Sequence, residues 1–356
     1  MNIIYDHTIF CLQQYGGISR YFHELINRVS IDNDVNIFKG LNINEYEFNK
    51  ENLKSFKGYK IPQIKYTGTL LTLLNNVGFD KEYSKIDDGM YHPTYYRKDM
   101  GKFTKMPIVL TVYDMIYEMF PDNFWNADSV IKSKKASIDC ADAIICISEN
   151  TKRDLMKLYD ISGNKIIVVY LSCTLPETTE IYKSDKPYLL YVGDRSAPYK
   201  NFWHFINVYA KYLSNEYNVV VFGGGFSPKE LKFISEHRLE NSVFHMQGDD
   251  TVLRSIYNGA YCLVYPSLYE GFGIPPLEAM ISGCPVVASD SSSIPEVVGD
   301  AGILFNPLSE DSMLDAILAV DKNRFGLVTA GYERVNRFSW DKMAKETMDV
   351  YESVSK

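Results

Sequence analysis

The residues best suited to chemistry lie in one stretch, 265–288, which reads YPSLYEGFGIPPLEAMISGCPVVA. A loop with two glycines carries Glu270, and two prolines precede Glu278. Glycine lets a backbone approach a ligand closely, and the N–H groups at a helix start favour phosphate. A carboxylate can accept hydrogen bonds from two neighbouring hydroxyls. The stretch therefore predicts a site for a phosphate-bearing, hydroxyl-rich ligand. The alternative is a purely structural role, in which the glycines only turn the chain and Glu278 is a solvated helix residue.

Two cations follow another apolar run, in VGDRSAPYKNF at 192–202. Arg195 and Lys200 would lie in a strand-to-helix loop, where paired positive charges can meet a diphosphate. Two basic residues in a loop are more often simply solvated. Their position after a buried strand, in an acidic half of the chain, favours a functional interpretation.

Glycine turns occur at two further places. Gly16 and Gly17 open an expected helix after the first apolar run, and Gly223 belongs to FGGGFSP at 222–228. Neither turn has the full GxGxxG spacing with an acidic partner that a dinucleotide site requires, so NAD is disfavoured. The six cysteines form no CxxC pair, and no histidine spacing suits zinc, so we expect reduced cysteines, no metal and no cofactor.

The second half of the chain supplies the elements that would position these residues. Short, wholly apolar runs alternate with helix-like segments, which is typical of a parallel sheet covered on both faces. We therefore expect an α/β, doubly wound, Rossmann-like domain there. The expected strands are 188–193, 218–223, 242–246, 261–265, 284–288 and 302–305, and the expected helices include 201–214, 228–238, 250–259 and 276–282.

The first half repeats this pattern more loosely and predicts a second domain of related build. Its apolar runs lie at 2–5, 107–112, 143–147 and 165–169. The polar segment 171–188 contains proline and suits a linker. We therefore place one domain at 1–172 and the other at 173–339. Residues 339–354 have the apolar spacing of an amphipathic helix.

Charge and hydropathy exclude several classes of protein. The net charge is −8, and residues 176–356 hold 16 basic against 24 acidic residues, which argues against nucleic acid as a partner. No run approaches the ~20 apolar residues of a membrane-spanning helix. We expect a cytoplasmic protein. In 56–79, lysines 57, 60 and 65 precede leucines 70, 71, 73 and 74. A core-facing helix is the favoured interpretation, and contact with the inner face of an anionic membrane is the alternative.

Taken in order, these motifs resemble the retaining glycosyltransferase family 4, and within it the bacterial O-antigen and capsule mannosyltransferases. The resemblance covers nearly the whole chain and rests on GGISRYF, DRSAPYKN, EGFGIPPLE and SGCPVVASDSSSIPEVVGDAGILFNP. It is most specific in two Glu separated by seven residues, which Glu270 and Glu278 match. The family fold is GT-B, two Rossmann-like domains facing a cleft. By resemblance, 1–172 binds the acceptor, 173–339 binds the nucleotide sugar, and helix 340–356 packs back on the first domain.

The resemblance also implies roles for single residues. Glu270 would contact the donor sugar and Glu278 the ribose, while Arg195 and Lys200 would neutralise the diphosphate. The remaining donor-binding positions are Gly16, Gly17, Gly223, Met246, Gly248, Gly271, Phe272, Gly273 and Ile274.

The implied reaction is retaining transfer of a sugar from a nucleotide diphosphate to a hydroxyl of a glycan or lipid-linked acceptor. Cations and N–H groups would stabilise the leaving diphosphate without a metal. GDP-mannose is the favoured donor, and a UDP-sugar is possible. A sugar-nucleotide epimerase of the same fold, or a non-catalytic binding partner of a second enzyme, remain alternatives.

One departure from the family concerns TVYDMIY at 111–117, where relatives often carry His-Asp and this chain has Tyr113 and Asp114. Tyrosine does not titrate near neutral pH, so a role for imidazole is lost there. Asp114 stays a candidate catalytic or sugar contact, with a structural turn as an equal alternative. For His92 a packed side chain is favoured over a substrate contact.

Overall fold

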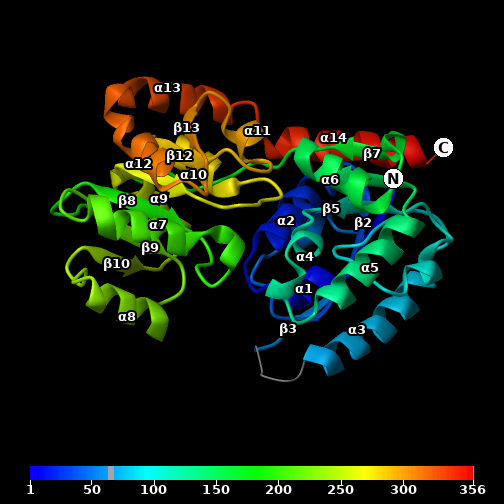
Figure 1. Ribbon diagram of the computed structural model, residues 1–356. Coiled ribbons are helices and arrows are strands. Elements are labelled where there is room, and N and C mark those ends of the chain that lie inside the picture. Colours follow the sequence, from blue (N-terminus) through cyan, green and yellow to red (C-terminus); the bar gives the residue numbers. More distant parts are fainter. Residues whose placement is uncertain (63–67, 356) are drawn as a thin grey trace. The chain divides into compact units, whose positions relative to one another are not determined.

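The structure, a computed structural model, describes residues 1–62 and 68–355. The chain divides into two compact units. Unit 1 comprises residues 1–171 and the segment from Trp340 onward, and unit 2 comprises Ser172–Ser339. Figure 1 labels elements of both units where there is room.

Unit 2 is built on one sheet of six parallel strands, in the order β10-β9-β8-β11-β12-β13. The central strands are buried almost throughout because helices cover both faces, which explains their apolar sequences. The strands are β8 (Tyr188–Val192), β9 (Asn218–Phe222), β10 (Val243–Met246), β11 (Cys262–Tyr265), β12 (Val286–Ser289) and β13 (Gly302–Phe305).

The helices of unit 2 follow these strands in the alternating order expected of parallel crossovers. On one face, Tyr191 and Val221 of the sheet share a buried core with Phe205 and Tyr209. The helices are α7 (Phe202–Val208), which continues as a π-helical turn (Tyr209–Leu213), α8 (Pro228–Glu236), α9 (Asp250–Gly259), α10 (Ile274–Ile281), α11 (Ile294–Val298), α12 (Glu310–Leu318) and α13 (Arg324–Val335).

Unit 1 has a four-stranded and a three-stranded parallel sheet, in the orders β3-β2-β1-β4 and β5-β6-β7. Tyr91 bridges to Ile108 and its N–H donates to Pro107 O at 2.9 Å, so the second sheet continues the first. The resulting order is the doubly wound pattern of unit 2. The strands are β1 (Asn2–Tyr5), β2 (Asp34–Asn42), β3 (Ser55–Lys60), β4 (Met90–His92), β5 (Val109–Val112), β6 (Ala143–Cys146) and β7 (Ile166–Val168).

Seven α-helices accompany these strands among the described residues of unit 1. They are α1 (Thr8–Leu12), α2 (Gly17–Val29), α3 (Gly68–Tyr83), α4 (Ile116–Met119), α5 (Ala127–Cys140), α6 (Glu149–Tyr159) and α14 (Trp340–Val354). In the stretches that the structure describes, no helix is both long and apolar enough to cross a membrane.

Helix α3 corrects one expectation about its leucines. Leu73 and Leu74 are 59% and 53% exposed, whereas Asn75 and Phe79 turn inward and are buried. Leu73 and Leu74 therefore lie outward, and the buried positions of α3 include the polar Asn75, whose side chain binds Leu41 N and O. Lys65 lies outside the described residues.

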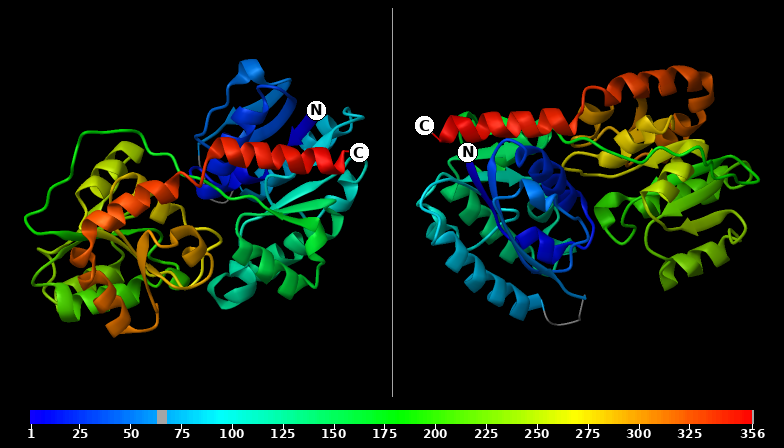
Figure 2. Two further views of the ribbon diagram at one scale, coloured as in Figure 1. Left: turned by 90° about the horizontal axis from the view of Figure 1, so that it is seen from above. Right: turned by 180° about the vertical axis from the view of Figure 1, so that it is seen from behind.

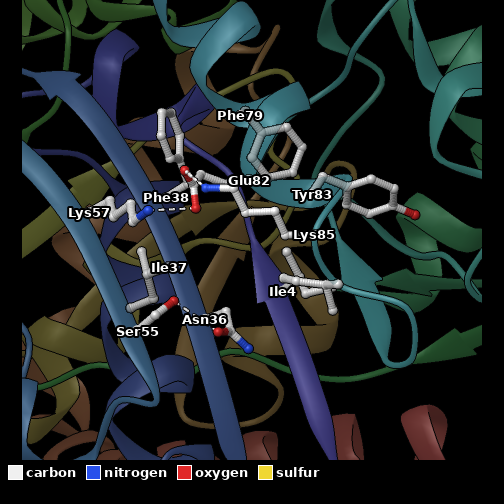
Figure 3. A pocket seen from close by; sticks show the side chains of 11 residues that line it. Ile4, Asn36, Ile37, Phe38, Ser55, Lys57, Phe79, Glu82, Tyr83 and Lys85 are labelled. Atoms are coloured by element: carbon white, nitrogen blue, oxygen red, sulfur yellow. Dashed lines mark hydrogen bonds and ion pairs between the residues drawn. The ribbon is translucent and has the colours of Figure 1, made fainter.

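A small hollow of about 110 Å³ lies between β1, β2, β3 and α3. Figure 3 shows the side chains that line it. Two of the three lysines that precede the leucines of α3 form ion pairs. Lys57 pairs with Glu82 at 2.5 Å across this hollow, and Lys60 pairs with Glu45. Ligand pockets usually exceed ~300 Å³, so this hollow is too small for a sugar.

Helix α14 completes the core of unit 1. It packs on α2 and β6, and the red ribbon runs along this unit in both views of Figure 2. The hydroxyl of Tyr351 lies 2.5 Å from His92 Nδ1 and 2.9 Å from the hydroxyl of Tyr5. The other nitrogen of His92 lies 2.9 Å from Thr111 Oγ1. His92 is therefore a packed histidine, as favoured from the sequence.

This network makes unit 1 sensitive to acid. Burial lowers the pKa of His92 to about 3, against a partly opposing effect of Asp6. Below about pH 6.5 the unfolded chain binds a proton at His92, whereas the folded chain binds it only near pH 3. Between these two pH values the free energy of unfolding therefore falls by about 1.4 kcal/mol for each pH unit of acidification.

We expect His92→Gln to flatten the dependence of the urea midpoint on pH between 4 and 6. The control is His237→Gln, which changes an exposed histidine at the end of α8. Parallel pH profiles for wild type and His92→Gln would contradict the assignment.

Candidate functional site

The strand order of unit 2 defines a crevice at one edge of its sheet. The chain leaves β8 toward β9 and later returns on the other side of β8 as β11. Loops after β8 and β11 therefore run in opposite directions, and ligands of doubly wound sheets bind between such loops. The loops in question are 193–201 and 266–273.

The structure brings Lys200 and Glu270 together at this point. Lys200 ends a short 3₁₀ turn (Pro198–Lys200) after β8, and Glu270 lies in the loop after β11. The ammonium Nζ contacts the two carboxylate oxygens at 2.7 and 2.9 Å, with both side chains mostly buried. The backbone N–H of Leu268 also donates to Tyr199 O at 2.7 Å. The two loops thus form one rigid edge with a paired cation and anion.

Side chains behind this edge fix Glu270. Ser293 Oγ donates to the carbonyl oxygens of Glu270 and Phe272, at 2.9 and 2.8 Å, and Ser292 Oγ accepts from Glu270 N at 2.9 Å. Burial raises the pKa of Tyr265 well above its usual value, and the Glu270 charge raises it further, because the tyrosine hydroxyl donates to that carboxylate. The motif DSSSIPE therefore positions the acidic loop, a role that the sequence analysis missed.

Arg195 lies on the other side of β8, toward β9. Its Nε donates to Glu230 Oε1 at 2.6 Å, and its Nη2 donates to the carbonyls of Gly224 and Gly225 at 2.5 and 2.9 Å. Arg195 was expected to be solvated or to face a ligand. It is instead buried and paired with Glu230, an acidic residue that no motif indicated. A hollow of about 540 Å³ opens beside Arg195 and Glu230.

Glu278 lies on α10, where its carboxylate is buried and accepts a hydrogen bond from the Tyr257 hydroxyl at 3.2 Å. Burial and this carboxylate raise the pKa of Tyr257. Gly273 caps α10 with a φ of 116°, a conformation that favours glycine, and Ile274 begins the helix. Glu278 is therefore a buried acid and not the solvated helix residue of the structural alternative.

Two of the predicted donor-binding residues, Gly223 and Met246, meet at the ends of β9 and β10. The N–H of Gly223 donates to Met246 O at 3.1 Å, and His245 Nε2 lies 2.7 Å from Gly223 O. Gly223 has a φ of 140°, and a Cβ placed on it would lie 3.5 Å from Gly193 O and 3.9 Å from Arg195 Nη1. Gly248 follows in the loop that leads to α9.

The remaining predicted residues belong to unit 1, so their contact with the unit 2 site stays a prediction. Gly16 precedes α2 and Gly17 begins it. The side chain of Gln13 already accepts from Ser19 N at 3.0 Å, which satisfies one amide of that helix start. Asp114 Oδ1 accepts from Ile116 N at 3.0 Å, as in a structural turn.

Tyr113 is buried and makes ring contacts with Tyr21, Tyr95 and Tyr96. This packing accounts for an aromatic ring at position 113.

Solved structures with this fold define its class as GT-B. Sucrose-phosphate synthase of Thermosynechococcus elongatus superposes with a TM-score of 0.77 at 18% identity, covering 99% of both chains. HepE of Anabaena, solved in complex with UDP and glucose, superposes with a TM-score of 0.72 at 15% identity, covering 99% of this chain and 100% of that one. These similarities confirm the expected α/β GT-B fold.

Residues 178–337 match the family model Glycosyl transferases group 1, so the chain carries a group 1 glycosyltransferase domain. It is 32% identical to the O-antigen chain mannosyltransferase RfbU of Salmonella typhimurium over 233 residues, 63% of this chain. It is 31% identical to the O-antigen chain mannosyltransferase B of Escherichia coli over 241 residues, 62% of this chain. The alignments span 65% and 63% of those two relatives. The part of the resemblance that concerns residues 178–337, a glycosyltransferase domain, is confirmed.

Proposed function

We propose that this protein is a retaining glycosyltransferase of surface polysaccharide synthesis. It moves a sugar from a nucleotide-diphosphate donor to a hydroxyl of a glycan or lipid-linked acceptor. GDP-mannose is the favoured donor because of the two O-antigen mannosyltransferase relatives, with a UDP-sugar as the alternative. The observation that carries the proposal is the Lys200–Glu270 pair at the switch point of the unit 2 sheet, with Arg195 across β8.

The donor would lie across the carboxyl ends of the strands. Its base would rest by Gly223, Met246 and Gly248, its diphosphate at the end of β8, and its sugar against Glu270. Glu278 would hold the ribose, since a carboxylate can accept hydrogen bonds from two neighbouring hydroxyls.

Charge stabilisation would be the main catalytic effect. As the bond from the anomeric carbon to the phosphate oxygen breaks, negative charge grows on the diphosphate, and Lys200 and Arg195 are fixed donors for it. The acceptor oxygen bonds to the same face of the anomeric carbon, and its proton passes to the departing phosphate oxygen. Two cations serve in place of a metal, so we expect activity to survive EDTA.

Unit 1 would bind the acceptor in a hollow of about 510 Å³ near the ends of β1 and β4. Tyr95, Tyr96 and Tyr117 line it together with Asn126 and Ser129. Aromatic faces with amide and hydroxyl groups suit a neutral sugar. Burial raises the pKa values of Tyr95 and Tyr117, and the nearby charge of Asp114 raises both further.

A lipid-linked acceptor would bring unit 1 to a membrane surface. Leu73, Leu74 and Val77 of α3 are 59%, 53% and 72% exposed on one stretch of helix, which supports shallow insertion at the inner face. Binding to anionic liposomes tests this part of the proposal, and Leu74→Asp should weaken it. Failure of the wild-type protein to bind anionic liposomes at both low and high salt would contradict the proposed membrane contact.

The function is tested by incubating the protein with GDP- and UDP-sugars. A transferase releases nucleotide slowly by hydrolysis and faster when the acceptor is added. A non-catalytic partner would bind without release, and an epimerase would change the sugar without releasing nucleotide. Transfer with inversion at the anomeric carbon would refute the retaining mechanism.

We expect Glu278→Ala to weaken nucleoside-diphosphate binding about tenfold or more, because a hydrogen bond to a charged group contributes about 1.5–3 kcal/mol. Calorimetric titration with GDP and UDP measures the change. Glu333→Ala, which alters an exposed acid on α13, is the control. Equal affinities for Glu278→Ala and wild type would remove the ribose role.

A further inference from the structure

Glu230 has no part in the motifs or in the proposed chemistry, yet it is the acidic partner of Arg195. We propose that Glu230 is a positioning residue that aims the Arg195 guanidinium at the donor diphosphate. This inference rests on the proposed function and deepens it.

Three bonds hold two of the three guanidinium nitrogens. Nε binds Glu230 Oε1 at 2.6 Å, and Nη2 binds the carbonyls of Gly224 and Gly225. Both ionic side chains are nearly buried, at 5% and 8% exposed. Within residues 1–62 and 68–355, Nη1 makes no hydrogen bond, and it lies 3.9 Å from the position of a Cβ on Gly223. The remaining donor edge therefore faces the glycine turns at the ends of β8 and β9.

Glu230 is itself held by hydrogen bonds to Ser227. Its Oε2 accepts from the backbone N–H of Ser227 at 2.6 Å, and its own N–H donates to Ser227 Oγ at 3.3 Å, which forms a capping box at the start of α8. These contacts and Arg195 outweigh burial and lower the pKa of Glu230, so it is charged at neutral pH. One oxygen serves the helix and the other serves Arg195.

Two aromatic rings also pack against the Arg195 guanidinium. Its carbon lies 5.3 Å from the ring centroid of Phe226 and 5.8 Å from that of Phe202. A planar guanidinium held at its edge and faces loses little entropy on binding a phosphate. A donor fixed before the reaction also costs no reorganisation when charge develops. The alternative is an ion pair that only ties the β8 loop to α8.

A double-mutant cycle separates these roles. The proteins are wild type, Glu230→Gln, Arg195→Gln and the double variant, and the probes are GDP, UDP, guanosine and uridine, titrated by calorimetry. In Glu230→Gln the amide cannot accept from both Ser227 and Arg195. We expect about tenfold weaker nucleoside-diphosphate binding, with nucleoside binding unchanged. In the Arg195→Gln background the same change should weaken nucleoside-diphosphate binding by less than about twofold.

Matched variants guard against a loss of folding. Glu236→Gln changes an exposed acid on the same helix and should leave binding and turnover unchanged. Glu230→Asp should restore part of the diphosphate affinity. Turnover of Glu230→Gln with a donor sugar should fall in kcat more than KM rises, since Arg195 acts most strongly on the developing charge.

Each contrary result has a distinct meaning. Equal diphosphate binding by Glu230→Gln and wild type would overturn the positioning role. A similar loss in both backgrounds would show that Glu230 acts independently of Arg195, and an equal loss for nucleosides would show a merely structural ion pair. Either result would also overturn the positioning role. Wild-type protein that binds neither GDP nor UDP would overturn the proposed function, and the inference would fall with it.

Discussion

Lys200→Ala is expected to lower kcat by about 10²–10³-fold, the usual effect of removing one preorganised charge donor from a transition state. The substitution removes a cation at the end of β8 and leaves the buried Glu270 carboxylate without its 2.7 Å partner. Because the proposed role concerns charge that develops as the diphosphate leaves, KM for the donor should change much less than kcat. Steady-state kinetics with the nucleotide sugar that the protein accepts measures both.

Two further variants sharpen this result. Lys200→Arg keeps the charge but not the compact ammonium, so we expect partial activity. Lys232→Ala removes a lysine that is 75% exposed on α8 and should behave as wild type. Turnover of Lys200→Ala within threefold of wild type would refute the catalytic role.

Tyr351→Ala is expected to destabilise unit 1 by about 3–5 kcal/mol, the range for truncating a large aromatic side chain in a core. Tyr351 is fully buried and its hydroxyl contacts both His92 and Tyr5. Truncation would leave a cavity and deprive two buried polar groups of a partner. Denaturant unfolding followed by circular dichroism measures the loss.

Smaller changes at α14 calibrate that prediction. Tyr351→Phe keeps the ring and should cost about 1 kcal/mol for the lost hydrogen bonds. Glu352→Ala lies on the exposed side of the helix and should stay within about 0.5 kcal/mol of wild type. A stable Tyr351→Ala protein would mean that α14 contributes little to the core.

The sequence predicted the sheet of unit 2 well because its strands are apolar on both faces. The run 188–193 became β8 (Tyr188–Val192), and 302–305 matched β13 (Gly302–Phe305). In unit 1, β2 (Asp34–Asn42) and β3 (Ser55–Lys60) were missed. These strands alternate polar with apolar residues and carry Lys39, Lys57 and Lys60, so no continuous apolar run marks them.

The sequence also found the cations and acids of the candidate site, but not how they are paired. Motifs singled out Arg195, Lys200 and Glu270, whereas Glu230 lies 35 residues from its arginine in an unremarkable helix start. The pairing depends on which strands are neighbours, which spacing along the chain does not reveal. One signal was present, because SPKE at 227–230 has the form of a capping box.

The return of α14 to unit 1 has a consequence for biosynthesis. The ribosome makes residues 1–171 first, yet Tyr5 and His92 find their partner Tyr351 only after all of unit 2 has been translated. A nascent chain would therefore hold Tyr5 and His92 without their partner Tyr351 while unit 2 folds on its own. Termination before Trp340 would damage the half of the protein that was translated earliest.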